Sequence, residues 1–247
     1  MERSNSELKD MARGMLCGRY GLVIGAMLLA SLIPSVLLVP FQYLYEGQSQ
    51  IPMQRVIWIV VNILVYLLQM MFMTGLMHIH LKVAYGLPAK ISDIFWICKN
   101  RPDRALLGGL LFGLIEMAPF APALALVYRY HGERRQLAVI ILLTIAGAML
   151  SIYFSFQYAF VFAAYADSGS VDTLEAFRIS ASLMENAKWK LCKMYISFIG
   201  WGLLCVATLG IGVLWVSPYL SQATINFYLE QKHAFDVKIE LRSEMKK

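Results

Sequence analysis

Long apolar stretches alternate with short polar or basic segments along the whole chain. Four of these stretches, at about residues 20–39, 56–83, 105–127 and 137–166, reach the roughly 20 residues that a helix needs to span the hydrocarbon core of a bilayer. The last apolar stretch is too long for one crossing, and Leu209-Gly-Ile-Gly212 interrupts it. We interpret it as a hairpin of two helices, at about 191–207 and 211–228. The pattern therefore predicts a single integral membrane domain over residues 1–247, an all-α polytopic bundle of six transmembrane helices.

The segment before the first crossing has apolar residues at helical spacing between polar ones. It opens with Ser4 and Glu7 at the spacing of a capping box, in which each side chain satisfies a backbone N–H of the other residue. We expect an amphipathic helix on the membrane surface, with Lys9 and Arg13 directed toward lipid head groups.

A second amphipathic segment follows the fourth crossing, where Asp172 and Glu175 repeat the capping-box spacing. We expect a surface helix whose apolar face contains Leu174, Phe177, Ala181 and Met184. Between the second and third crossings, residues 84–103 form a basic segment with a short amphipathic turn at 91–97. Both segments are predicted to lie at the same side of the membrane.

Basic residues are divided unevenly between the two sides that six crossings define. The chain is 59% hydrophobic, only 15% charged and carries a net charge of +6, whereas soluble domains have about 25% charged residues. Both termini share a side with 18 of the 22 Lys and Arg residues; the others are Arg55, Arg129, Arg134 and Arg135. Because cytoplasmic loops carry the excess of Lys and Arg, we expect both termini in the cytoplasm. The charge predicts contact with anionic head groups of the bilayer on that side, and no nucleic-acid partner.

The sequence contains no phosphate-binding loop, no nucleophile elbow and no zinc-protease motif. His78 and His80 are two residues apart on a predicted helix and so point away from each other, with no further ligands nearby. The cysteines form no C-x-x-C pair and are interpreted as reduced structural thiols: Cys17, Cys98, Cys192 and Cys205. We expect no metal, no cofactor and no enzymatic activity.

Glu116 is the one formal charge deep within a predicted crossing, where a charged side chain costs about 3 kcal/mol to insert. Together with Asn62, Gln69 and Gln157 it forms a candidate intramembrane polar site. One interpretation is a proton or cation site beside a water-filled cavity. The other is a protonated or hydrogen-bonded glutamate that faces the bundle.

The most specific motifs lie in the last third of the chain, in Leu174-Glu-Ala-Phe, Lys188-Trp-Lys190, Ser197-Phe-Ile-Gly-Trp201, Leu209-Gly-Ile-Gly-Val-Leu-Trp215 and Pro218-Tyr219. With Ser6-Glu-Leu-Lys9 and Ser92-Asp-Ile-Phe95, they resemble a bacterial integral membrane family known as domain of unknown function 975, which is distantly similar to the membrane domain of some glycerophosphodiester phosphodiesterases. The chain departs from the family in the fourth crossing, where Ile145-Ala-Gly-Ala stands in place of a Pro-Gly followed by lysine.

This resemblance implies a six-helix protein of the bacterial cell membrane and supplies no activity. It implies structural roles for Trp189, Gly200, Trp201, Gly210, Gly212, Trp215, Pro218 and Tyr219. Trp201 and Trp215 flank the glycine-rich turn and either pack against neighbouring helices or line a ligand groove.

Three classes of function remain open. The first is a non-enzymatic membrane interaction or scaffold protein, which binds anionic lipid and a membrane-protein partner or a second copy of itself. The second is a small permease or export accessory with a cavity near Glu116. The third is an accessory to a lipid-acting membrane enzyme. Surface helices and abundant basic residues favour the first, because a transporter is expected to show broken helices in matching repeats, which this sequence lacks.

Overall fold

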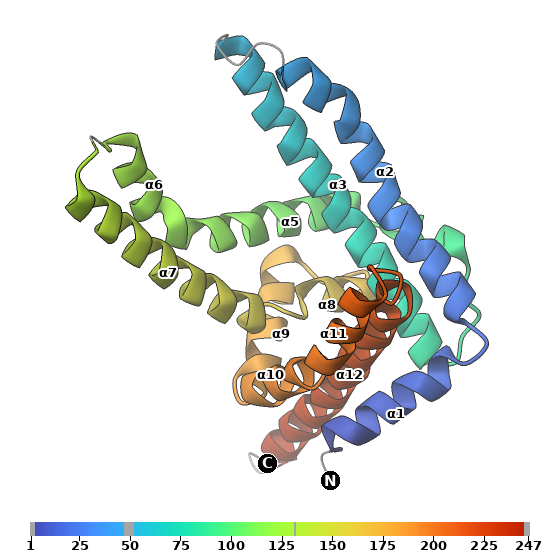
Figure 1. Ribbon diagram of the computed structural model, residues 1–247. Coiled ribbons are helices and arrows are strands. Elements are labelled where there is room, and N and C mark those ends of the chain that lie inside the picture. Colours follow the sequence, from blue (N-terminus) through green and yellow to red (C-terminus); the bar gives the residue numbers. More distant parts are fainter. Residues whose placement is uncertain (1–2, 47–51, 131, 245–247) are drawn as a thin grey trace.

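A computed structural model describes residues 3–46, 52–130 and 132–244, and this part of the chain consists of helices joined by turns and short loops, without a strand (Figure 1). The helices are α1 (Asn5–Leu16), α2 (Tyr20–Glu46), α3 (Pro52–Ala84), η1 (Ile91–Phe95), α4 (Trp96–Lys99), α5 (Pro102–Met117), η2 (Ala118–Phe120), α6 (Ala121–Tyr128), α7 (Arg134–Gln157), α8 (Val161–Ser168), α9 (Thr173–Met184), α10 (Lys188–Ile196), α11 (Ile199–Ala207) and α12 (Val213–Glu244). The predicted all-α helical bundle is confirmed.

Five stretches in the described residues are long and apolar enough to cross a membrane: Tyr20–Tyr43, Met53–Ala84, Pro102–Tyr128, Arg134–Ser168 and Lys188–Ala207. They coincide with the first five predicted crossings. The sixth prediction, residues 211–228, falls in the first half of α12, which continues unbroken to Glu244. The polar side chains of Gln222 and Asn226 lower the mean hydropathy of this segment, although both are buried.

Two long hairpins extend from a shared packed region (Figure 1). One consists of α2 and α3, and the other of α6 and α7; the helices of each pair lie side by side. We call these the two arms. The packed region, here called the hub, consists of α1, α8, α9, α10, α12 and the last turns of α3, which share one buried core. Most of the fully buried large side chains belong to the hub, among them Tyr228, Phe160 and Leu191.

Several glycines allow close approaches between elements. A Cβ on Gly75 would lie 1.9 Å from the Ile94 carbonyl oxygen, so only glycine lets η1 contact the α3 backbone. Cβ atoms on Gly109 and Gly113 would lie about 3 Å from Met70 and Tyr66, which shows that the G-x-x-x-G face of α5 packs on α3.

The glycines around the start of the first crossing are not packed as closely against other elements. The sequence suggests that Gly18, Gly21 and Gly25 admit a neighbouring helix. Gly18 and Gly21 have no other atom within 4 Å of a built Cβ, and only Gly25 is approached, by Ile91 at 3.3 Å. The expected small-residue interface is therefore limited to one position, because α2 meets α3 mainly through its other side chains.

The predicted turn of the last hairpin is confirmed. Leu209 and Gly210 both adopt left-handed backbone conformations, with φ of 51° and 90°. The Gly210 amide donates to the Cys205 carbonyl at 2.8 Å, and the Gly212 amide donates to Thr208 Oγ1 at 2.9 Å. These bonds satisfy backbone groups at the end of α11 and reverse the chain into α12.

The N-terminal amphipathic helix forms as predicted, but its apolar face is not available to a membrane. Ser4 and Glu7 make the reciprocal capping box. Leu8, Ala12 and Leu16 are at most 1% exposed because α1 packs along α12. The expected burial of this face in lipid is therefore replaced by burial in protein.

The predicted head-group cations of α1 also have protein partners. Lys9 donates to Ser197 Oγ at 3.1 Å and lies over the Phe198 ring. The Arg13 guanidinium lies 5.8 Å from the centre of a Trp201 ring and 5.3 Å from that of Tyr219. Cation–π contacts therefore dock this helix on the final hairpin.

The second amphipathic helix, α9, differs from its prediction at the N-terminus. Asp172 occupies the N-cap position, but its side chain makes no capping bond and instead pairs with Arg104 at 3.0 Å. Leu174 is 64% exposed, so it does not belong to the buried face. That face consists of Ala176, Phe177, Ser180, Leu183 and Met184.

Candidate functional site

Glu116 lies near the end of α5 and is bound by two hydroxyl groups of α7. Ser155 Oγ donates to Glu116 Oε1 at 2.8 Å, and Ser151 Oγ donates to Oε2. Ser151 and Ser155 are four residues apart and so lie on one face of α7. The carboxyl group thus joins α5 to α7 as a hydrogen-bonded glutamate that faces the bundle.

The other three polar residues predicted with Glu116 do not bond to it. Asn62 donates to the Trp58 carbonyl of its own helix at 2.8 Å. Gln69 is exposed. Gln157 donates to the Ala181 carbonyl at 3.2 Å, and its Oε1 is buried without a partner. The structure therefore does not bring the four residues together, and Glu116 lines neither of the two cavities described below.

The two histidines of α3 point in different directions, as predicted. His78 stacks on the Trp96 ring at a centroid distance of 4.2 Å and contacts the Ala166 carbonyl through Nδ1. His80 is fully buried and contacts Gln222. Within residues 3–46, 52–130 and 132–244, no three His, Cys, Asp or Glu side chains are grouped so that they could hold a metal ion.

Asp167 is the polar centre of the hub. Its side chain is 6% exposed and accepts hydrogen bonds from the Tyr85 phenol at 3.0 Å and the Tyr228 phenol at 3.1 Å. Lys232 also pairs with it. Burial and the negative charge of Asp167 together raise the pKa of Tyr85 to about 12. One carboxylate thus joins the ends of α3 and α8 to the middle of α12.

A chain of buried polar side chains crosses from α3 to α1. His80 Nδ1 meets Gln222 Oε1 at 2.9 Å, and Gln222 Nε2 donates to Asn226 Oδ1 at 3.3 Å. Asn226 Nδ2 then donates to the Leu8 carbonyl at 3.2 Å. Because Gln222 Oε1 accepts, His80 carries its proton on Nδ1, which leaves the buried Nε2 as an acceptor without a partner.

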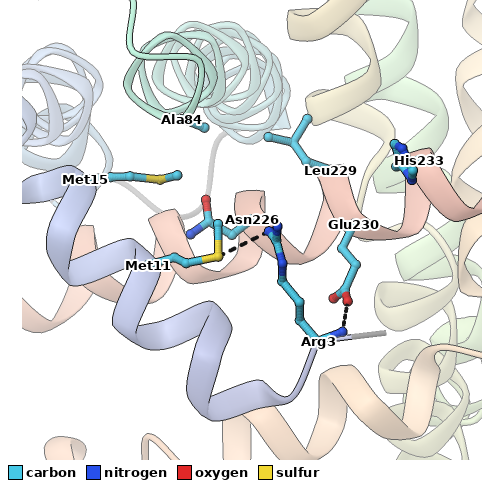
Figure 2. Close-up of a pocket in the computed structure, with 8 residues that line it drawn as sticks. All are labelled: Arg3, Met11, Met15, Ala84, Asn226, Leu229, Glu230 and His233. Atoms are coloured by element: carbon cyan, nitrogen blue, oxygen red, sulfur yellow. Dashed lines mark hydrogen bonds between the residues drawn. The ribbon is translucent and has the colours of Figure 1, made fainter. Parts of the chain in front are cut away.

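Asn226 also forms part of the wall of a cavity between α1, the end of α3 and α12 (Figure 2). The cavity has a volume of about 380 Å³. One part of its lining is apolar and the other carries charged or polar groups; the residues are Arg3, Met11, Met15, Ala84, Asn226, Leu229, Glu230 and His233. None of the site residues predicted from the sequence lines this cavity.

A smaller cavity of about 160 Å³ lies where α1 meets the final hairpin. Trp201, Trp215 and Tyr219 of the sequence signature line it together with Arg13. The two tryptophans therefore do border a groove, and the guanidinium of Arg13 packs on two of its aromatic rings.

The remaining signature residues differ in their surroundings. Pro218 is buried within α12 and Gly210 supplies the left-handed turn. A Cβ on Gly212 would lie 2.9 Å from Thr208 Oγ1, whereas Gly200 faces open space. Trp189 is 65% exposed, and Lys193 lies over its ring.

Sequence reasoning missed most of these partners. Asp167, Gln222 and Asn226 are absent from the predicted sites. A polar residue within an apolar stretch indicates burial beside a partner. Gln222 and Asn226 both lie in such a stretch. Nothing local in the sequence indicates Arg3 and Glu230, which are 227 residues apart.

The fold defines the class: an all-α helical bundle with five described helices that are long and apolar enough to cross a membrane, as in a membrane protein. The family described as "Protein of unknown function (DUF975)" matches residues 135–234, which supports the resemblance to that family over α7 to α12. The N-terminal motifs lie outside the matched range. No curated protein and no solved structure matches the chain.

Proposed function

We propose that this chain is a non-enzymatic scaffold of the bacterial cell membrane, which binds anionic lipid on its cytoplasmic side and holds a membrane-protein partner or a second copy through its arms. The observation that carries the proposal is the contrast between the arms and the hub. Val36, Leu64, Leu142 and Met149 on the arms are 60% to 68% exposed. Buried polar groups of the hub bond mainly to one another.

The polar contacts support a scaffold over a permease. A transport site requires polar groups that converge on a path for the substrate. Glu116 instead bonds to Ser151 and Ser155, and the predicted companions lie apart from it. The proposal includes six crossings with both termini in the cytoplasm. It also includes the distant resemblance to the membrane domain of glycerophosphodiester phosphodiesterases, because a scaffold of this kind would anchor a partner at the membrane.

Contacts with other side chains decide which basic residues can meet lipid. Lys9 and Arg13 contact the final hairpin, as described above. Lys188 donates to the Tyr153 hydroxyl at 3.2 Å. Lys99 and Arg178 are exposed on the proposed cytoplasmic side. Lys193 is exposed there too and lies over the ring of Trp189, as in an interfacial anchor.

The test compares two triple variants of the full chain. The first is Lys99→Gln, Arg178→Gln and Lys193→Gln; the matched control, on the opposite side, is Arg129→Gln, Arg134→Gln and Arg135→Gln. Each protein, purified in dodecyl maltoside, is titrated with phosphatidylglycerol, and native mass spectrometry measures the bound lipid. We expect the first variant to bind less than half as much as the unmodified chain and the control to bind as much. Equal binding by the two variants would contradict the lipid contact.

A further inference from the structure

The cavity between α1, α3 and α12 has opposite charges on its polar part. Arg3 supplies a guanidinium and Glu230 a carboxylate, while Met11, Met15, Ala84 and Leu229 supply apolar surface. Figure 2 shows the Arg3 side chain extending past Asn226, with Glu230 beside the Arg3 backbone. We propose that this cavity binds a zwitterion that carries a primary ammonium and an anionic oxygen group, of the phosphoethanolamine type.

Arg3 would bind the anionic group. Its Nη1 donates to Met11 Sδ at 3.2 Å, and a thioether sulfur is a weak acceptor. A phosphate or carboxylate oxygen would exchange this weak bond for a charge-assisted one, and the planar guanidinium can hold two such oxygens at once. The arginine is therefore already positioned in the cavity without a strong acceptor for its guanidinium.

Glu230 would bind the ammonium. Its side chain is 11% exposed, accepts from the Arg3 amide through Oε1 and meets Lys190 Nζ at 3.4 Å through Oε2. An ionised carboxylate has about four acceptor positions, so these bonds leave capacity for another donor. A primary ammonium has three N–H donors and a quaternary ammonium has none, so the site distinguishes ethanolamine from choline.

The walls suit a small amphipathic molecule. The volume of about 380 Å³ lies at the low end of the range of ligand pockets. Asn226 is held by Leu8 and Gln222, so this part of the wall is preorganised. Ala84 is the last residue of an apolar span, which places the cavity at a helix end, where lipid head groups lie.

Two sources share this chemistry: the head group of a phospholipid, and a free soluble zwitterion. The site is separate from the exposed basic residues of the proposed function and does not depend on them. Isothermal titration calorimetry on the full chain in dodecyl maltoside uses three probes: dihexanoyl-phosphatidylethanolamine, dihexanoyl-phosphatidylcholine and glycerophosphoethanolamine. We expect the ethanolamine lipid to bind at least tenfold more tightly than the choline lipid.

Three variants test the site, and two exposed variants serve as controls. Arg3→Gln and Glu230→Gln should each weaken binding of the ethanolamine lipid about tenfold or more, because each removes a charged hydrogen-bond partner. Ala84→Phe should block binding by filling the cavity while both charges remain. Arg135→Gln and Glu185→Gln are exposed controls that should bind as the unmodified chain does. Circular dichroism and gel filtration confirm that each variant is folded.

The outcomes are distinct. Binding of glycerophosphoethanolamine as well as the lipid supports a soluble zwitterion, and binding of the lipid alone supports a head-group site. Equal binding of the ethanolamine and choline lipids would overturn the proposal, as would no binding of any probe. Retained binding in folded Arg3→Gln, Glu230→Gln and Ala84→Phe proteins would also overturn it.

Discussion

The phenol of Tyr228 donates to Oδ2 of Asp167 at 3.1 Å and so links α12 to the last turn of α8. Tyr85 and Lys232 bond to the same carboxylate. The negative charge of Asp167 therefore serves three donors from two other helices. Removing that charge leaves a cation and two phenols to share a weaker acceptor.

We expect Asp167→Asn to lower the free energy of unfolding by roughly 1–3 kcal/mol, because a largely buried charged hydrogen-bond network is broken. The measurement is an unfolding titration with dodecyl sulfate in mixed micelles. Asp10→Asn is the control, since Asp10 is exposed on α1. A difference between the two variants of less than about 0.5 kcal/mol would mean that the network contributes little.

Gly75 allows η1 to contact α3, and its substitution should be costly. A Cβ there would lie 1.9 Å from the Ile94 carbonyl oxygen, which belongs to the backbone and cannot rotate away. We expect Gly75→Ala to lose about 3 kcal/mol or more of unfolding free energy. Gly21→Ala should be neutral or stabilising by about 0.5–1 kcal/mol, because its Cβ meets open space within a helix. The same titration compares the two, and equal losses would refute the close approach.

The ion pair of Lys82 and Asp93 should make stability depend on pH in the acid range. Burial alone would raise the pKa of Asp93, but hydrogen bonds from Lys82 and the Lys90 amide, with the charge of Lys82, lower it overall. Because the folded pKa lies below the unfolded value, the contribution is present above that value and is lost as the pH falls through the folded one.

We therefore expect the stability difference between the unmodified chain and Asp93→Asn to shrink as the pH falls from about 6 to about 3. Unfolding titrations at several pH values measure this difference. A difference that stays constant, or that grows in acid, would show that the carboxylate is not stabilised in its charged form.

Glu116 should couple energetically to Ser155. A double-mutant cycle of Glu116→Leu and Ser155→Ala is expected to give a coupling of about 1 kcal/mol, because each single change removes the same hydrogen bond. A cycle of Glu116→Leu and Ser35→Ala should give none, since Ser35 bonds to Ser31 of its own helix. Coupling that is equal in the two cycles would argue against a local bond.

The topology can be tested by labelling. In a variant without native cysteines, Glu133→Cys and Leu209→Cys should react with an impermeant maleimide on intact cells, because both exposed positions lie in turns of the proposed outer side. A chain that retains only Cys98 should react after permeabilisation. A fluorescent protein fused to the C-terminus should fluoresce; a dark fusion would contradict the even number of crossings.

Local patterns in the sequence were sufficient for local structure. The capping box of Ser4 and Glu7 and the turn at Leu209 and Gly210 formed as expected, since short-range backbone bonding determines them. The same spacing at Asp172 and Glu175 did not form a capping box, because Arg104 competes for Asp172. A partner 68 residues distant cannot be read from spacing within one helix.

The candidate sites were less predictable for the same reason. Glu116 was correctly singled out as a charge in an apolar segment, but its hydroxyl partners follow only from the rotation of α7 against α5. Such rotations depend on side-chain packing along the whole interface. The cavity near Arg3 forms only where α1, the end of α3 and α12 meet, and periodicity within one element does not predict contacts between elements.

The contact of α1 with α12 also constrains the order in which this protein can assemble. Leu8 accepts a hydrogen bond from Asn226, 218 residues later. At synthesis rates of about 5–20 residues per second, the first helix waits roughly 10–45 s for its partner to be made. The arms can form hairpins during that interval, because each pairs neighbouring segments. Until α12 has been made, the apolar face of α1 lacks this partner and must be covered by the membrane surface or by another protein.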